Sequence, residues 1–230
     1  MKIEGLQKLT LLDYPGRLAC TVFLGGCNLR CPFCHNADLV LPGRPSADIG
    51  RGELIDFLKK RRGVLQGVCV TGGEPLVSDG VEELLREIKD LGYAVKLDTN
   101  GTFPDRLQAL AAQGLVDYVA MDVKNAPESY GPTVGLPGFD PAPVLRSAAF
   151  LLSGAVEYEF RTTVVDELHT EADFESIGRW LAGAKRYFLQ GFVDSGNLVG
   201  QGLHAAPKER MERFRQILLP LIPAAEIRGV

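Results

Sequence analysis

Short apolar segments with the composition of β-strands alternate with longer amphipathic segments along most of this 230-residue chain. Such alternation is typical of repeated βα units, in which helices cover a mainly parallel sheet. We expect strands at residues 18–24, 68–71, 94–98, 118–122, 158–165 and 186–190. The pattern therefore predicts an α/β fold, a partial (β/α)6 TIM-like barrel with mainly parallel strands that is less closed than an eight-unit barrel.

The clearest helix in the pattern follows Ser78 and stops at Gly92. Serine is a typical N-cap, and glycine is the usual residue after the last helical turn. Apolar side chains recur at helical spacing between these positions, namely Val81, Leu84, Leu85, Ile88 and Leu91. Similar patterns predict helices at residues 51–61, 104–113, 142–153, 171–182 and 207–218.

Two segments rich in glycine and proline, Pro42–Pro45 and Asn125–Pro141, are expected to be loops. The second is 17 residues long, which is unusual inside a compact domain and often indicates a functional loop. A variable surface excursion is the alternative interpretation. Because no low-complexity linker divides the sequence, we predict a single domain spanning residues 1–230.

The composition favours a cytoplasmic protein with a sizeable core. Hydrophobic residues make up 46% of the chain and charged residues 23%, with a formal net charge of −4. This charge gives no electrostatic reason to expect nucleic-acid binding. No segment approaches the roughly 20 consecutive apolar residues of a membrane span, and the N-terminus lacks the apolar core of a secretory signal. We therefore expect no nucleic-acid partner, no membrane association and a reducing compartment.

Three cysteines stand close together in the run GGCNLRCPFCHN, at Cys27, Cys31 and Cys34. A [4Fe–4S] cluster normally takes one thiolate at each iron, so a set of three leaves one iron open to a small chelating molecule. Open coordination is typical of catalytic metal sites. The spacing therefore predicts one catalytic [4Fe–4S] cluster. The other two cysteines, Cys20 and Cys69, lie in apolar segments and are expected in the core.

A zinc site with His35 as its fourth ligand is the alternative for the same run. Cys34 and His35 are adjacent in the sequence, and adjacent side chains have difficulty reaching one tetrahedral ion. The spacing therefore favours iron and sulfide, while a non-catalytic zinc or redox module stays open.

Polar motifs follow the next two expected strands, at the end where parallel α/β folds bind their ligands. The segment TGGEP contains Gly72, Gly73 and Glu74. Its glycines allow a ligand to come close to the backbone, and an ordinary turn is the alternative. The segment DTNG offers oxygens for a ribose or a cation, at Asp98, Thr99 and Asn100.

Asp122 and Lys124 follow the fourth expected strand in the segment AMDVK. They are two residues apart, so both point to one face of the strand. Lys124 is a compact cation suited to a carboxylate, whereas an edge salt bridge is the plainer interpretation. Arg161, on the next strand, is expected to reach the same cavity or an acidic partner on the sheet. His169 is expected to be an exposed loop histidine.

The cysteine spacing, with the aromatic Phe33 before the last cysteine, resembles the signature of the radical S-adenosylmethionine (SAM) superfamily. The longer run GLQKLTLLDYPGRLACTVFLGGCNLRCPFCHN, followed by GGEP, DTNG and DVK, is similar to the activases of glycyl-radical enzymes. Within these, the chain is most similar to the activating proteins of anaerobic ribonucleoside-triphosphate reductase, over essentially its whole length.

The resemblance implies a role for each matching residue. It implies that the cluster ligands, and with them the catalytic centre, are Cys27, Cys31 and Cys34. It implies that the adenine side of SAM is contacted by Phe33 and His35. It implies that the methionine amino group is received by Gly72, Gly73 and Glu74.

The carboxylate end of SAM has its own implied set. By similarity to pyruvate formate-lyase activase, Asp98, Thr99 and Asp122 are implied to hold a monovalent cation near the methionine carboxylate. Lys124 is implied to contact that same end, and Asn100 belongs to the same cofactor-binding group. That activase has a histidine in its fifth helix, which this chain lacks, so His169 receives no role.

The implied activity is reductive cleavage of SAM, giving a 5′-deoxyadenosyl radical that takes a hydrogen atom from one glycine of a partner enzyme. The implied partners are a glycyl-radical enzyme, in particular the anaerobic reductase, and a low-potential electron donor such as flavodoxin or ferredoxin. The 125–141 segment is our candidate for contact with the enzyme partner. A radical SAM enzyme acting on a small molecule is the alternative, and the short chain favours the activase.

Overall fold

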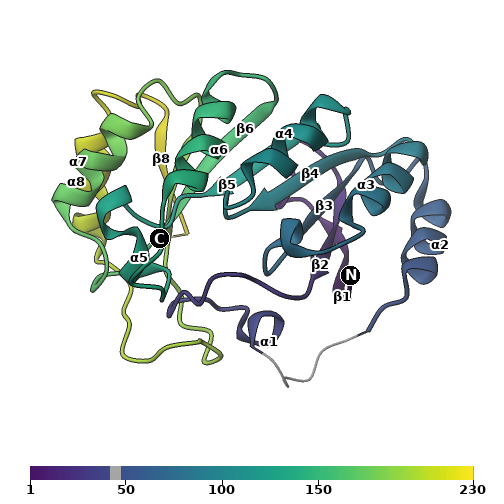
Figure 1. Cartoon of the computed structure of the whole chain (residues 1–230), viewed down its shortest axis with the longest axis horizontal. Coiled ribbons are helices and arrows are strands. Elements are labelled where there is room, and N and C mark those ends of the chain that lie inside the picture. The colour runs from purple at the N-terminus through teal and green to yellow at the C-terminus, as the bar shows by residue number, and fades with distance from the viewer. Residues whose placement is uncertain (42–47, 230) are drawn as a thin grey trace. The chain divides into compact units, whose positions relative to one another are not determined.

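The computed structural model describes residues 1–41 and 48–229, so the predicted Pro42–Pro45 loop lies outside the described residues. Within that part, the chain has an α/β fold whose eight strands follow one another in chain order in one sheet (Figure 1). The chain divides into two compact units, each with strands and helices of its own. The single domain expected for residues 1–230 stays a prediction.

The first unit comprises residues 1–28, 38–99 and 105–119. Its complete strands are β1 (Ile3–Thr10), β2 (Ala19–Leu24), β3 (Gly67–Gly72) and β4 (Ala94–Thr99). The helices that lie wholly or almost wholly in it are α1 (Ala37–Val40), α2 (Arg51–Arg61), the 3-10 turn η1 (Pro75–Val77), α3 (Val81–Asp90) and α4 (Pro104–Ala112). β1 pairs antiparallel with β2, whereas β2, β3 and β4 are parallel.

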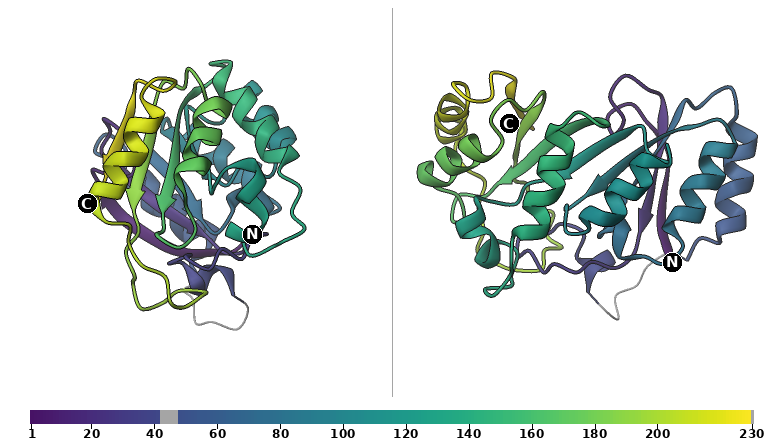
Figure 2. Two further views of the ribbon diagram at one scale, coloured as in Figure 1. Left: turned by 90° about the vertical axis from the view of Figure 1, so that its left-hand side faces the viewer. Right: turned by 45° about the horizontal axis from the view of Figure 1, so that its top comes forward.

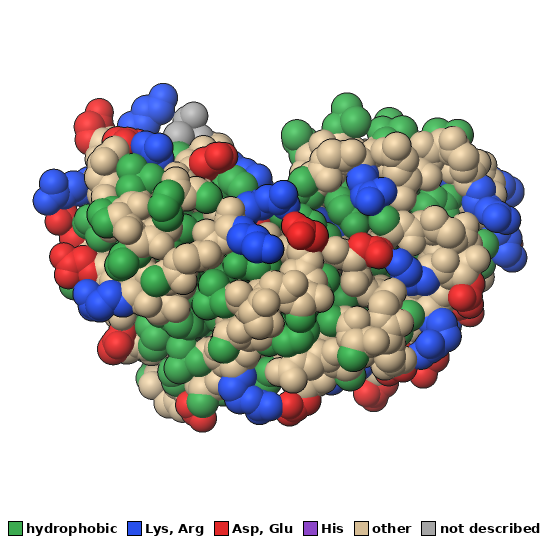
Figure 3. All heavy atoms as spheres, turned by 90° about the horizontal axis from the view of Figure 1, so that it is seen from above, with side chains coloured by type: hydrophobic (Ala, Val, Ile, Leu, Met, Phe, Trp, Pro, Cys, Tyr) green, Lys and Arg blue, Asp and Glu red, His purple; other side chains and the backbone are tan. Residues whose placement is uncertain are grey.

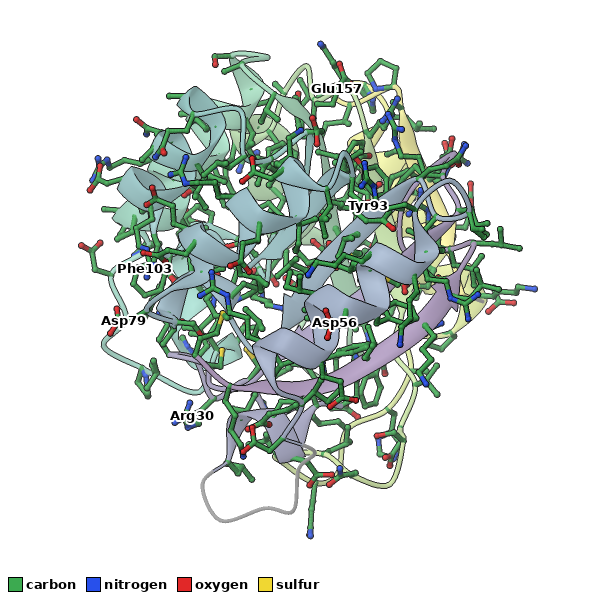
Figure 4. The ribbon with its side chains drawn as sticks, turned by 90° about the vertical axis from the view of Figure 1, so that its right-hand side faces the viewer. Arg30, Asp56, Asp79, Tyr93, Phe103 and Glu157 are labelled. Atoms are coloured by element: carbon green, nitrogen blue, oxygen red, sulfur yellow. The ribbon has the colours of Figure 1, made fainter. Side chains whose placement is uncertain are left out.

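Helix α3 confirms the predicted apolar face, because Val81, Leu84, Leu85 and Ile88 are all buried. The predicted N-cap is wrong: Ser78 ends the 3-10 turn η1, and Gly80, with φ +81°, precedes the helix instead. Gly92 adopts φ +89° just beyond the helix, a left-handed conformation that suits glycine. Tyr93, labelled in Figure 4, then fixes β4 to α2 by donating its hydroxyl to the Leu58 carbonyl at 2.7 Å.

The second unit comprises residues 29–37, 100–104 and 120–230. β5 (Tyr118–Asp122) begins in the first unit and ends in the second, which also contains β6 (Glu157–Val164), β7 (Tyr187–Gly191) and β8 (Ala225–Arg228). Its helical elements are η2 (Pro127–Ser129), α5 (Tyr130–Thr133), α6 (Ala142–Leu152), α7 (Glu171–Trp180) and α8 (Lys208–Leu218). β6, β7 and β8 are parallel. α7 and α8 lie side by side (Figures 1 and 2), where the Phe174 and Phe214 rings stack with centroids 4.3 Å apart.

All the predicted strands are confirmed to within one residue at each end. β1 and β8 were not predicted. β1 lacks a clean alternation, since three consecutive residues, Gln7, Lys8 and Leu9, are exposed. β8 has only four residues, Ala225–Arg228, which is too short for a periodic signal.

The 125–141 segment is not the plain loop that its composition predicted, because it contains η2 and α5. Asn125 and Tyr130 in it are fully buried. The Asn125 side-chain amide donates to Thr133 Oγ1 and to the Leu168 carbonyl, both at 2.9 Å. Buried polar groups with such partners organise a segment even where glycine and proline interrupt regular structure.

Charged side chains of both signs are interspersed on the face drawn in Figure 3, with no large patch of one sign. Among the residues that the structure describes, no helix is long and apolar enough to cross a membrane.

Candidate active site

The four motifs singled out in the sequence each follow a strand. The cysteine run comes after β2, GGEP begins at the end of β3, and DTNG and DVK begin at the last residues of β4 and β5. The predicted placement is therefore confirmed along the chain. Cys27 belongs to the first unit, whereas Cys31 and Cys34 belong to the second.

Two backbone anchors hold the cysteine loop in the second unit. The Arg30 amide donates to the Val134 carbonyl at 3.0 Å, and the Gly200 amide donates to the Pro32 carbonyl at 2.7 Å. Gly135 is required here, because a Cβ at this position would lie 2.3 Å from the Arg30 carbonyl oxygen and its φ is +74°. Part of the 125–141 segment thus supports the cysteine loop, while the Arg30 side chain itself is exposed.

The loop turns tightly between its last two cysteines, where the Cys34 amide donates to the Cys31 carbonyl at 3.0 Å. Cys31 is 7% exposed and Phe33 is 4% exposed. Lys124 lies above the Phe33 ring, with Nζ 5.9 Å from the centroid. His35 is exposed, yet partial loss of water and the charge of Lys124 lower its pKa. The second unit therefore brings Cys31, Phe33 and Lys124 together.

In the first unit, Gly72 and Gly73 allow two backbones to pack against each other. A Cβ on Gly72 would lie 2.1 Å from the Leu24 carbonyl oxygen, and one on Gly73 would lie 2.1 Å from that of Gly26. The same Cβ on Gly73 would be 3.2 Å from Cys27 Cβ. The sequence predicted that these glycines let a ligand come close to the backbone. In this structure they let the backbone after β3 come close to the end of β2 and the start of the cysteine loop.

Glu74 is fully buried and joins the turn after β3 to the end of β4. Its Oε1 accepts hydrogen bonds from the Leu76 amide at 3.0 Å and from Thr99 Oγ1 at 2.9 Å. The Glu74 amide donates to the Gly26 carbonyl at 2.8 Å. Glu74 thus orders the GGEP turn, a structural role that the sequence left as an alternative.

Asp98, at the end of β4, pairs with Lys96 on the same strand. Asn100 follows in the second unit, where its Oδ1 accepts from the Thr102 amide at 3.0 Å and from Thr102 Oγ1 at 2.6 Å. This local turn is common chemistry for an Asn-Gly pair. Lys96 was not among the predicted site residues, because a lysine inside an apolar strand segment gives no sign of its partner.

Asp122 stands between two cations in the second unit. Lys124 Nζ lies 3.0 Å from its Oδ2, and Arg161 Nη2 lies 2.8 Å from its Oδ1. Burial on its own would raise the pKa of Asp122, but Arg161 and Lys124 outweigh it and the net shift is downward. Burial opposes the charge of Lys124 as well, yet Asp122 and Cys31 raise its pKa above the usual range. The salt-bridge interpretation is confirmed, and Arg161 has the acidic partner that was expected as one option.

His169 is fully buried, so the expectation of an exposed loop histidine is wrong. His169 Nδ1 lies 3.1 Å from the Val165 amide nitrogen and 3.2 Å from the Val165 carbonyl oxygen, whereas Nε2 faces the Lys124 carbonyl, which can only accept. The proton is therefore on Nε2, and Nδ1 accepts from the Val165 amide. Nε2 then donates to the Lys124 carbonyl at 2.9 Å, and burial lowers the pKa of the imidazole. The Lys124 amide donates to the Tyr130 hydroxyl oxygen at 3.2 Å. The two rings thus hold both backbone groups of Lys124.

The cysteine thiols fit the chemistry of an iron–sulfur cluster. None of the five cysteines, all of which lie in the described part of the chain, forms a disulfide, and thiolates are the ligands that iron–sulfur clusters take. Within the described residues, no group of three cysteine, histidine or carboxylate side chains is already gathered as a metal site. Ligation by Cys27, Cys31 and Cys34 therefore stays a prediction, as do the SAM contacts.

Relatives of known name support the interpretation of these motifs. Residues 21–181 match the sequence model of the family described as the radical SAM superfamily. A protein of Methanocaldococcus jannaschii, provisionally named a glycyl-radical enzyme activating enzyme, is 33% identical over 195 residues, covering 83% of this chain and 79% of that protein. A pyruvate formate-lyase-activating enzyme of Staphylococcus aureus is 29% identical over 133 residues, covering 54% of this chain and 53% of the enzyme.

A solved structure shares the fold at much lower sequence identity. SuiB of Streptococcus suis, bound to the precursor peptide SuiA, gives a TM-score of 0.70 at 12% identity, covering 91% of this chain and 48% of that chain. SuiB bound to S-adenosylmethionine gives a TM-score of 0.66 at 14% identity, covering 91% and 52%. With the parallel strands described above, this similarity confirms the predicted fold class.

Proposed function

The chain belongs to the radical SAM superfamily, and we propose that it generates the glycyl radical of an anaerobic ribonucleoside-triphosphate reductase. Relatives that are named activating enzymes support an activase of glycyl-radical enzymes. The choice of reductase rests on one observation, the similarity of the chain, over essentially its whole length, to the activating proteins of that enzyme.

The superfamily uses a [4Fe–4S] cluster and SAM. When bound, this pair supplies one-electron cleavage of SAM and the abstraction of a hydrogen atom from the substrate. In this chain Cys27, Cys31 and Cys34 hold the cluster in our proposal. Membership in the superfamily favours this set over the zinc module that the sequence left open.

The remaining motif residues bind and orient SAM in the proposal. Phe33 and His35 contact its adenine side, and the turn formed by Gly72, Gly73 and Glu74 receives the methionine amino group. The ammonium of Lys124 faces the methionine carboxylate. Asp122, which pairs with Lys124, has a lowered pKa and therefore carries a full negative charge at neutral pH. Asp98, Thr99 and Asn100 complete the set at the end of β4.

The proposed substrate is a peptide segment. SuiB, which shares the fold, has been solved with a precursor peptide, so the fold accommodates a peptide in that protein. The exposed parts of the 125–141 segment remain our candidate for contact with the reductase. Flavodoxin or ferredoxin remains the proposed electron donor.

Electron paramagnetic resonance spectroscopy tests the proposal directly. The protein is reconstituted without oxygen, reduced, and mixed with SAM and the anaerobic reductase from the same organism, while 5′-deoxyadenosine is assayed. The expected result is a doublet from a glycine-centred radical on the reductase, together with 5′-deoxyadenosine. A reductase whose radical-bearing glycine is replaced by alanine is the matched control and should give no doublet.

Two other outcomes contradict the proposal at different levels. Formation of 5′-deoxyadenosine with no doublet keeps the radical chemistry and assigns it another substrate, either a different glycyl-radical enzyme or a small molecule. If the protein carries a fully loaded cluster and yields neither the glycyl radical nor 5′-deoxyadenosine, the proposal that it is an enzyme is contradicted.

A further inference from the structure

Lys96 is a buried lysine at the end of a row of polar side chains inside the first unit. Its side chain is 2% exposed, and Nζ pairs with Asp98 Oδ1. Nζ also donates to Cys69 Sγ at 3.8 Å, and Cys69 Sγ lies 3.7 Å from the same Asp98 oxygen. A lysine buried this deeply needs a carboxylate beside it.

The strand register explains why these groups meet. Thr21 on β2 is paired with Cys69 on β3, and Cys69 is paired with Lys96 on β4. Residues paired across parallel strands project from the same face, so the three side chains form one row. Asp98 is two residues further along β4, on the same face and nearer the end of the strand. Lys96 therefore reaches Asp98 from within the sheet, and the Asp98 side chain keeps 14% exposure.

We propose that Lys96 is a built-in counter-cation for Asp98, which takes the place of a free monovalent ion at the end of β4. The inference rests on the proposed function, because the resemblance assigns Asp98 to a cation beside the carboxylate of SAM. A potassium ion and the ammonium of Lys96 carry the same charge and compete for the same carboxylate. The ammonium is tethered, so its presence at Asp98 is independent of the salt in the cell.

The consequence is a difference in cation dependence that can be measured without turnover. SAM affinity is determined by isothermal titration calorimetry on the cluster-loaded protein, in tetramethylammonium chloride and in potassium chloride at equal ionic strength. Tetramethylammonium has no N–H group and is too bulky to replace the buried ammonium. The wild type is expected to bind SAM equally well in both salts.

Lys96→Met keeps the length of the side chain and removes its charge. This variant is expected to bind SAM weakly in tetramethylammonium and to recover about tenfold in affinity in potassium. Lys96→Arg restores a positive charge and is expected to be independent of potassium. Lys89→Met is the matched control in the same unit, because Lys89 Nζ lies 2.7 Å from Asp117 in a more exposed pair; it should show no potassium effect.

Thermal unfolding of the same cluster-loaded proteins without SAM separates this inference from the proposed function. Potassium is expected to raise the melting temperature of Lys96→Met and to leave that of the wild type unchanged. If the wild type fails to bind SAM, the proposed function is contradicted, and the melting comparison still decides whether Lys96 neutralises Asp98.

Two results would overturn the inference. One is wild-type SAM binding that requires potassium, which needs no variant and therefore stands even if Lys96→Met does not fold. The other is a folded Lys96→Met protein whose SAM affinity and melting temperature are both indifferent to potassium.

Discussion

Two strands end in the same pair of residues placed in opposite order. β4, which ends at Thr99, carries Lys96 and Asp98 in its last four residues, and β5 ends at Asp122, with Lys124 two residues beyond it. In each, a lysine and an aspartate two residues apart share a face and form an ion pair. The β4 lysine comes first and is 2% exposed, whereas the β5 lysine comes last and is 17% exposed.

The order of the two residues decides which charge lies at the end of the strand. In β4 the buried ammonium lies behind the carboxylate, so Asp98 is presented with its counter-charge already supplied. In β5 the ammonium lies beyond the carboxylate, and Arg161 provides Asp122 with a second cation. The first strand end therefore presents an acceptor and the second a cation, although their compositions are nearly identical.

The largest expected effect concerns the cluster, which is proposed to bind the SAM molecule that both strand ends contact. Cys31→Ala is expected to lower the iron content of the reconstituted protein from about four atoms per chain and to abolish SAM cleavage. Cys20→Ala is the control, because burial raises the pKa of Cys20 to about 12 and the thiol is inert at neutral pH. Iron and sulfide analysis with the visible absorption spectrum measures both variants. Full iron in Cys31→Ala would contradict the assigned ligand set.

The next effect tests the difference in burial between the two lysines. Lys96→Met should lower the free energy of unfolding by about 3–5 kcal/mol, because it removes the buried ammonium from the largely buried Asp98 carboxylate. Lys124→Met should cost about 1 kcal/mol, because Asp122 retains Arg161 and the pair is more exposed. Urea denaturation of the cluster-loaded proteins measures both. Equal losses in the two variants would show that burial does not distinguish the strand ends.

The sequence predicted which residues lie at the strand ends better than it predicted the ion pairs that these residues form. Strand-end placement followed from hydrophobic segments and turn residues, which are local signals, so Asp98, Asp122 and Lys124 were found. The burial of Lys96 depends on its register opposite Cys69, and the pairing of Asp122 with Arg161 spans 39 residues of sequence. Contacts between strands that are distant in sequence leave no local pattern.

The same reason explains what was missed around the second strand end. His169 lies four residues beyond Val165, in a segment whose sequence predicts an ordinary loop. Its hydrogen bond to the Lys124 carbonyl arises only when β5 and β6 are placed side by side. The helical turns within the 125–141 segment were missed because proline and glycine, which usually interrupt helices, also occur in short helical turns.

The third prediction tests whether the position of Lys124 at the end of β5 depends on its hydrogen bond with His169. His169→Phe keeps a ring in the buried site and removes the hydrogen bond to the Lys124 carbonyl. Because the backbone of Lys124 is then held only through Tyr130 among the contacts described above, we expect about tenfold weaker SAM binding with little change in the rate at saturating SAM. His169→Gln, which can still donate to that carbonyl, should recover part of the loss. A fall in rate with unchanged SAM affinity would contradict the positioning role.

The smallest effect concerns the charge of Asp122 itself. Burial favours its neutral form, and Arg161 and Lys124 favour the anion; the net shift lowers its pKa. An aspartate with a lowered pKa in the folded protein contributes stability that is complete above its unfolded pKa of about 3.9 and is lost as the pH falls through the folded value. The destabilisation caused by Asp122→Asn should therefore be constant from about pH 5 to 8 and shrink only in stronger acid. Urea denaturation of both proteins across this range measures it. If the destabilisation instead grew as the pH fell from 7 to 5, the folded pKa of Asp122 would be raised, burial would dominate over the two cations, and the β5 end would present its lysine without a permanently charged partner.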